Sequence, residues 1–375
     1  MHLHLLIADA SSWLPPIAWF YGGFVLLVCA CLALDLGVFH RTAHVVSMRE
    51  AVTWTVIWVM AALAFTGAVF MIYDAHWLGV GREVPQLDGS ARDVHGLEAA
   101  KLFLTGYLVE KSLAIDNVFV IAMIFSYFAV PAIYQHRVLF WGILGALVMR
   151  GIMIALGAAL IHQFSWIIYV FGGFLILTAA KMALVPTSGI DPERNPVVRL
   201  VRRLHPVTSR YDGQRFFTRE NGVRMATPLF LALIMVEVTD LIFAVDSIPA
   251  IFAITADPFI VFTSNILAIL GLRSLYFCLA SMIHRFRYLK PALIGILFFV
   301  GAKMMLVHTS FKVDPTVSLL VVLGILGAGV AASLLTAAPS APQPAPAPEP
   351  GPGAVRPGTG ASPTRRPPAA APVDA

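Results

Sequence analysis

Charged residues are scarce in this 375-residue chain, because Asp, Glu, Lys and Arg together make up only 13% of it. A soluble domain carries about 25%. Hydrophobic residues make up 58% of the chain, and its mean hydropathy is +0.81. This composition excludes an ordinary soluble domain and predicts an all-α, polytopic membrane protein. The formal net charge of +5 does not indicate nucleic-acid binding, since the basic residues lie mainly in loops.

Cysteines and soluble-enzyme motifs are also scarce. The three cysteines, Cys29, Cys31 and Cys278, fall in apolar stretches and define no disulfide framework. The sequence contains neither H-E-x-x-H nor G-x-S-x-G, which excludes the common zinc and serine hydrolases. The G-x-G-D signature of intramembrane aspartyl proteases is missing as well. We therefore expect no enzyme. The N-terminus has no basic region or clear cleavage site, so no removed signal peptide is expected.

The apolar stretches predict membrane spans, each needing about 20 residues. Nine are expected, at 17–39, 52–73, 98–128, 137–160, 166–185, 228–255, 259–283, 288–307 and 316–336. The loop at 186–227 carries eight arginines against four acids. Because cytoplasmic loops are rich in Lys and Arg, we expect the N-terminus outside and the C-terminus in the cytoplasm of a bacterial inner membrane.

These spans divide the chain into segments. The predicted segments are a two-helix part (1–97), a three-helix repeat A (98–185), a basic cytoplasmic loop (186–227), a three-helix repeat B (228–307), a final span (308–337) and a tail (338–375). The tail holds twelve of the 25 prolines, among Ala, Gly and Ser. Such a segment cannot form a core, so disorder is expected there.

Acidic residues recur at matching positions in two of the spans. "EKSLAIDNVFVIAMIF" (110–125) aligns with "DLIFAVDSIPAIFAIT" (240–255). The alignment pairs Glu110 with Asp240 and Asp116 with Asp246. It continues through Arg150 and Arg273 on the next spans. Because each copy has three spans, the copies are expected to have opposite orientations in the membrane, as in many secondary transporters.

The mid-membrane acids are the candidate functional groups. One charged side chain at the centre of a membrane helix costs roughly 2.5–3.5 kcal/mol. The predicted cation site comprises Glu110, Asp116, Asn117, Glu237, Asp240 and Asp246. Asn265 is a further candidate ligand, and Lys111, Arg150 and Arg273 are expected to balance charge. Five acids against three bases leave a surplus that protons or a cation would neutralise.

Helix geometry alone does not bring these acids together. Glu237 and Asp240 are three residues apart and share a face, but Asp246 points elsewhere on a regular helix. Pro249 is therefore expected to kink or unwind the helix beside Asp246. The oxygen-only ligand set favours Mg²⁺, Ca²⁺ or Mn²⁺ over Cu or Zn. The competing interpretation is structural, with the acids serving only as ion-pair partners in helix packing.

The chain resembles the TerC family of integral membrane proteins, particularly its Alx-type members. The resemblance covers about residues 17–336 and rests on "ALDLGVFHR" (33–41), "GYLVEKSLAIDNVFV" (106–120) and a motif at 237–277 that begins "EVTDLIFAVDSIPAIFAIT". It implies export of a metal ion, manganese foremost, with protons as counter-ion and no permanently bound cofactor. It points to the same acids, with Asp35 as a weaker match.

The resemblance also leaves an alternative open. The family's older label is tellurium resistance, and Alx-type proteins have been called redox modulators. A non-transporting stress-response protein of that kind is the second hypothesis. The expected partners are the lipid bilayer, the metal ion and protons, without nucleic acid. The sequence defines no oligomeric state.

Overall fold

Each apolar range predicted from the sequence contains a helix in the computed structural model. The structure describes residues 17–37, 46–164, 166–184, 196–220, 222–280, 288–309 and 313–336. The helices are α2 (Ile17–Gly37), α3 (Met48–Asp74), α4 (Gly96–Tyr127), α5 (Ala132–Gln163), α6 (Ile167–Leu184), α7 (Pro196–Leu204), α8 (Pro228–Phe252), α9 (Pro258–Leu270), α10 (Leu272–Ala280), α11 (Leu289–Met305) and α12 (Pro315–Leu335). Together with the short turns and strands between them, they form a helical bundle.

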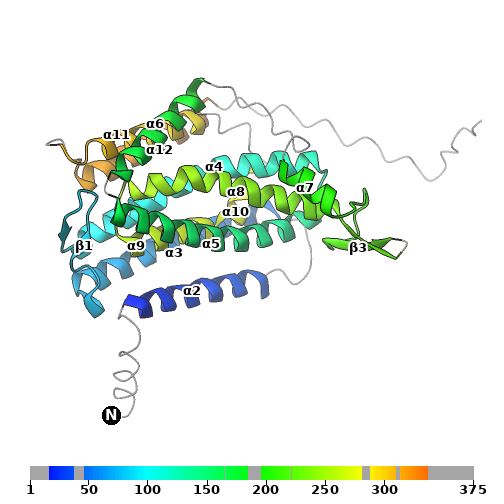
Figure 1. Ribbon diagram of the computed structural model, residues 1–375, viewed down its shortest axis with the longest axis horizontal. Coiled ribbons are helices and arrows are strands. Elements are labelled where there is room, and N and C mark those ends of the chain that lie inside the picture. Colours follow the sequence, from blue (N-terminus) through cyan, green and yellow to red (C-terminus); the bar gives the residue numbers. More distant parts are fainter. Residues whose placement is uncertain are drawn as a thin grey trace, which may run out of the picture. The chain divides into compact units, whose positions relative to one another are not determined.

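Two hairpins and a short 3₁₀ turn, η1 (Trp77–Gly79), complete the described elements. Strands β1 (Val84–Pro85) and β2 (Ala91–Arg92) pair antiparallel before α4. Strands β3 (Phe217–Glu220) and β4 (Val223–Ala226) pair antiparallel before α8. Figure 1 shows β1 near one end of helices α4, α5 and α8, and β3 beyond the other end.

Several helices begin where an oxygen-bearing residue precedes a proline. Asp257 accepts hydrogen bonds from the backbone amides of Phe259 and Ile260 and is followed by Pro258. Asp314 accepts one from Thr316 and is followed by Pro315. The Thr316 contacts lower the pKa of Asp314, which favours its ionised form. Proline suits the first helical position because its fixed φ is already helical and no amide is left unpaired.

The exterior of the helices is apolar, as expected in a bilayer. Five helices, α3, α5, α6, α8 and α12, are long and apolar enough to cross a membrane, or six if the bent pair α9 and α10 counts as one span. Helix α4 has 32 residues but carries charges throughout, including Glu110, Lys111 and Asp116. Helix α11 has only 17 residues. The described part of the chain is therefore that of a polytopic helical membrane protein.

Two contacts establish the relative direction of α4 and α8. Gly106 of α4 lies beside Ile251, near the end of α8, while Asn117 bonds Asp240, in the middle of α8. The two helices are therefore antiparallel. Helix α4 also packs against α9, and α5 packs against α8.

The expected unwinding at Pro249 is not present, because α8 continues as a helix to Phe252. Pro249 lies in the last turn of α8 and has no amide to donate to the carbonyl of Val245. The interruption lies instead at Gly271, where α9 and α10 meet at a bend of 43°. A Cβ at Gly271 would lie 3.0 Å from both Lys111 Nζ and Trp58 Cβ, so a larger residue would not fit there without displacement.

The tail and the residues flanking the first span lie outside the described structure. The chain divides into two units after Thr336, and the predicted disordered tail lies wholly in the second. The side chain of Asp35, the weakest candidate ligand, is also outside the described part. The predicted 1–97, 98–185, 186–227, 228–307 and 308–337 segments stay predictions.

Close glycine contacts between α6 and α11 generate the first testable prediction. A Cβ on Gly301 would lie 3.0 Å from the carbonyl oxygen of Gly172 and 3.0 Å from Leu175 Cβ, whereas one on Gly173 would meet no atom within 4 Å. We expect Gly301→Val to destabilise the protein by about 1–3 kcal/mol through overpacking. Thermal denaturation of the detergent-purified protein would measure it. Gly173→Val is the matched control, and equal melting temperatures for the two variants would contradict this packing.

Candidate functional site

The centre of the bundle contains a buried guanidinium, that of Arg150 on α5. Its side chain is 1% exposed and contacts residues on three other helices. It forms an ion pair with Glu110 of α4 through Nη1. It also holds Asp240 of α8 in a two-point contact, with Nη2 at 3.2 Å from Oδ1 and Nε at 3.4 Å from Oδ2. Two-point contacts of this kind fit the planar guanidinium and fix its orientation.

Neutral side chains complete the network. Arg150 Nη1 donates to Ser247 Oγ at 3.1 Å and to Asn265 Oδ1 at 3.4 Å. Asn265 in turn donates to Glu110 Oε2 at 3.0 Å. Each buried charge thus has several partners, which offsets part of the cost of removing it from water. Two carboxylates share one guanidinium, so the network retains a formal negative charge when both are ionised.

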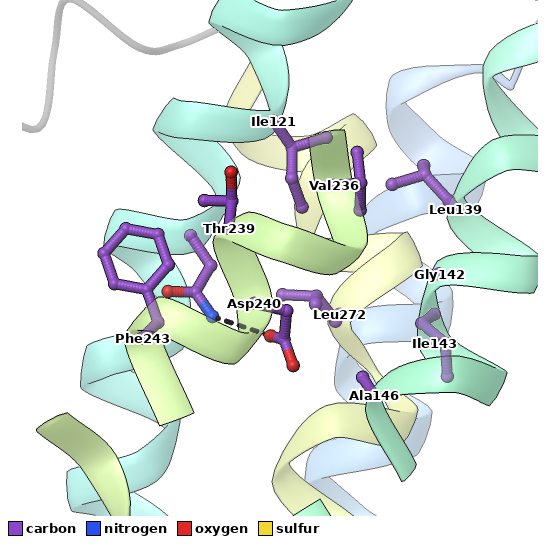
Figure 2. A pocket seen from close by; sticks show the side chains of 11 residues that line it. Ile121, Leu139, Gly142, Ile143, Ala146, Val236, Thr239, Asp240, Phe243 and Leu272 are labelled. Atoms are coloured by element: carbon purple, nitrogen blue, oxygen red, sulfur yellow. Dashed lines mark hydrogen bonds between the residues drawn. The ribbon is translucent and has the colours of Figure 1, made fainter. Parts of the chain in front are cut away.

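A small cavity lies on one side of this network. Asn117 of α4 donates to Asp240 Oδ1 at 3.3 Å, and both residues line the cavity. Figure 2 shows Asp240 directed from α8 toward the space in front of Gly142 and Ala146 of α5. The cavity has a volume of about 20 Å³. That is room for about one water-sized particle.

A second cavity of about 20 Å³ brings Asp116 of α4 and Asp246 of α8 together. Arg150, Asn117 and Ser247 also line it. The Asp246 carboxylate accepts a hydrogen bond from Thr178 of α6 at 3.1 Å. Asn117 therefore lies between the two cavities, and its neighbour Asp116 belongs to the second one.

Asn117 has one atom without a partner. Its Nδ2 is committed to Asp240, while its Oδ1 is buried and accepts no hydrogen bond within the described part of the chain. Burying an amide oxygen without a partner costs roughly 1–3 kcal/mol. Such an atom commonly faces a water, an ion or a ligand.

The structure thus places the sequence-predicted residues in separate groups. Glu110, Asp240, Asn117 and Asn265 join the Arg150 network, and Asp116 and Asp246 share the second cavity. Glu237 belongs to neither group. Across the described ranges, no group of three or more His, Cys, Asp or Glu side chains could hold one metal ion. The six-residue metal site therefore stays a prediction.

The predicted charge-balancing residues differ in their contacts. Arg150 contacts two of the acids, as described above. Lys111 instead donates to the backbone carbonyl of Ala268 on α9, at 3.1 Å. Arg273 is buried on α10. The sequence prediction omitted Thr178, which donates a hydrogen bond to Asp246.

Helices that are long and apolar enough to cross a membrane surround a buried charge network. The protein is therefore a polytopic helical integral membrane protein. Comparison with known proteins narrows this class. Residues 95–341 match the model of the integral membrane protein TerC family. The chain belongs to the TerC family. No solved structure matches it.

Curated relatives cover most of the chain. An "Uncharacterized membrane protein STKORF319" of Myxococcus xanthus is 52% identical over 84% of this chain and 92% of the relative. The "Putative membrane-bound redox modulator Alx" of Escherichia coli K12 is 50% identical over 83% of this chain and 92% of the relative. A Rickettsia felis membrane protein is 38% identical over 83% and 96%.

The network generates a second prediction. Arg150→Met leaves Glu110 and Asp240 buried without their counter-ion, so we expect a loss of about 3–5 kcal/mol of stability. Thermal denaturation in detergent would measure it. The triple variant Arg150→Met, Glu110→Gln, Asp240→Asn should recover much of the loss, because no buried charge is left uncompensated. Arg137→Met is the control, because it removes a guanidinium that stacks on Phe216 and pairs with no acid among the described residues. An Arg150→Met melting temperature equal to wild type would contradict the account.

Proposed function

We propose that this protein exports a divalent metal cation, Mn²⁺, from the bacterial cytoplasm, with protons as counter-ion. The observation that carries the proposal is the second cavity. Two aspartates from different helices line it together with Asn117, whose amide oxygen has no hydrogen-bond partner among the described residues. Carboxylate and carbonyl oxygens are the ligands that hard divalent cations prefer.

The size of the cavity indicates how a cation would bind. About 20 Å³ accommodates a single water-sized particle and not a cation with its full water shell. The ion would therefore exchange most of its waters for Asp116, Asp246 and the Asn117 oxygen. Ser247 Oγ, which accepts from Arg150, is a further oxygen at the same place. Arg150 already neutralises part of the charge on Glu110 and Asp240. It would therefore limit how many cations the whole group of acids attracts.

The proposed architecture is nine spans with an inverted three-helix repeat. In support, α4 and α8, which begin the two copies, run antiparallel. Their packing partners are also exchanged, because α4 packs against α9 of the second copy and α8 packs against α5 of the first. Under the repeat, Glu110 corresponds to Asp240 and Asp116 to Asp246. Both corresponding pairs meet, the first on Arg150 and the second at the cavity.

The alternative is a non-transporting membrane protein with a redox-modulating role. The name of the Alx relatives favours it. The cysteines give it little support, since none of the three forms a disulfide. Cys29 and Cys31 are two residues apart on α2 and so point to nearly opposite faces of the helix. A redox role would therefore require groups other than a thiol pair.

The transport proposal predicts that the second cavity is essential. Proteoliposomes containing the purified protein should accumulate radiolabelled Mn²⁺, and Asp116→Asn or Asp246→Asn should abolish most of the uptake by removing a charged ligand. Asp212→Asn, on the loop before β3, is the matched control and should transport normally. Normal uptake by both cavity variants would refute the assigned site. Absence of uptake by the wild type, for Mn²⁺ and Mg²⁺ alike, would favour the non-transporting alternative.

The proposed orientation predicts a labelling pattern. In a chain whose three cysteines are replaced, Ser209→Cys places a thiol on the exposed basic segment after α7. A membrane-impermeant thiol reagent should leave it unmodified in intact cells and modify it after the membrane is opened. A cysteine at Asp88, in the β1–β2 hairpin, should already be modified in intact cells. Labelling of Ser209→Cys in intact cells would reverse the orientation and the direction of transport.

A further inference from the structure

The segment from α7 to β4, residues 196–227, is fixed to one end of the bundle. Helix α7 packs against α8, and Val198 of α7 is only 1% exposed. The Tyr211 hydroxyl donates to the carbonyl oxygen of Phe128, just after α4, at 2.6 Å. Figure 1 shows α7 and β3 at the same end of the bundle, away from β1. Contacts with the spanning helices therefore set the position of this segment.

This end of the bundle lies at a membrane surface. Helices α5 and α8 are long and apolar enough to cross a membrane, and each begins beside the segment. Arg137, near the start of α5, stacks on Phe216, and α8 begins at Pro228, directly after β4. Tyr127, the last residue of α4, is 46% exposed. Because tyrosine is enriched at the level of the lipid headgroups, this places α7 at that level too.

Helix α7 has apolar side chains on two sides. Val198 and Val201, three residues apart, face the bundle, where they are buried and half-buried. Leu200 and Leu204, four residues apart, share a different face and are 53% and 67% exposed. The described part of the chain therefore leaves this leucine face uncovered. At the surface of a bilayer, such side chains gain free energy by moving from water to acyl chains.

Two arginines adjoin the leucine face. Arg203 lies three residues after Leu200, and Arg199 lies four residues before Arg203, so both are beside the leucines on the helix surface. Arg202 is different, because it shares the side of Val198, four residues earlier, and points away from the leucines. All three arginines are exposed.

The segment contains more arginines than its own acids can neutralise. Residues 196–227 include seven arginines against two acids, and α7 has no acid at all. Asp212 pairs with Arg215, and Glu220 accepts a hydrogen bond from Thr208. The segment therefore carries surplus positive charge at the level where lipid phosphates lie.

We propose that α7 is a binding surface for anionic phospholipids, with Arg199 and Arg203 on headgroup phosphates and Leu200 and Leu204 among the acyl chains. Guanidinium groups form charge-assisted hydrogen bonds with phosphate oxygens, and basic amphipathic helices lie in the plane of the interface in this way. A free phosphate ion or a nucleic acid would contact the arginines but leave the leucines in water. The proposal does not depend on cation export. Bound lipid would anchor the segment that joins the two predicted repeats.

Lipid retention tests this surface. The protein is purified in detergent with equal amounts of phosphatidylglycerol and phosphatidylcholine, and mass spectrometry counts the lipids that stay bound to the folded protein. The wild type should retain phosphatidylglycerol in several-fold excess. Arg203→Gln should reduce this excess several-fold, whereas Arg203→Lys should keep most of it.

Arg202→Gln is the matched control for lipid retention, because it removes the same charge from the opposite side of the same helix. It should retain nearly as much phosphatidylglycerol as the wild type. Equal retention by the Arg202→Gln and Arg203→Gln variants, or no lipid preference in the wild type, would overturn the proposal.

A spin label measures the depth of the leucine face independently. In a cysteine-free chain in nanodiscs that contain phosphatidylglycerol, a label on Leu204→Cys should relax mainly with oxygen, which concentrates among acyl chains. A label on Ser209→Cys, on the exposed part after α7, should relax mainly with a water-soluble nickel chelate. Equal access of the chelate to both positions would place α7 in water and contradict the proposal. Magnetic coupling between labels on two copies of the chain would contradict it too, because the leucine face would then be a self-contact.

Discussion

The ion pairs of Arg150 are the interaction on which the interior of this bundle depends. One guanidinium, 1% exposed, connects α5 to Glu110 of α4, to Asp240 and Ser247 of α8, and to Asn265 of α9. Helices in lipid have no hydrophobic force that drives them together, so packing and polar contacts set their arrangement. A buried charge that needs several partners at once restricts these four helices to one register. The same contacts leave the network with more acid than base, and that excess is what a cation or a proton can use.

The arrangement of the acids follows the correspondence between the two halves of the sequence. Glu110 and Asp240 occupy matching positions and meet at Arg150, while Asp116 and Asp246 also match and meet at the second cavity. Asn117, which follows Asp116, lies between the two and keeps one amide oxygen without a partner in the described structure. The symmetry is incomplete, because Arg150 occupies the centre and its counterpart Arg273 lies on α10 after the bend at Gly271.

Much of this site could be predicted from the sequence, because charged residues in apolar spans are few and each one is informative. That scarcity identified Arg150 as a counter-ion, and it does pair with Glu110 and Asp240. The set of cation-binding acids and the pairing of the two halves stay predictions. The direction of each side chain could not be predicted. Pro249 suggested an unwound turn in α8, yet α8 continues as a helix past it to Phe252, and a bend lies at Gly271 instead. Lys111 was expected to balance an acid; its ammonium group is close enough to Glu110 for a favourable electrostatic interaction, but its hydrogen bond goes to the backbone carbonyl of Ala268. The carboxyl group of Glu237 lies against Gly145 of α5, and no local pattern reveals a contact between residues so far apart in the sequence.

The second cavity is the proposed binding place of the divalent cation. Electron paramagnetic resonance of Mn²⁺ tests this binding directly, because the six-line signal of the hydrated ion weakens when the ion exchanges its waters for protein ligands. Titration of the purified protein in nanodiscs should show saturable loss of this signal. The double variant Asp116→Asn, Asp246→Asn should show none, although its melting temperature should be close to that of the wild type. Equal binding of Mn²⁺ by the wild type and this variant, or no binding by either, would contradict the account.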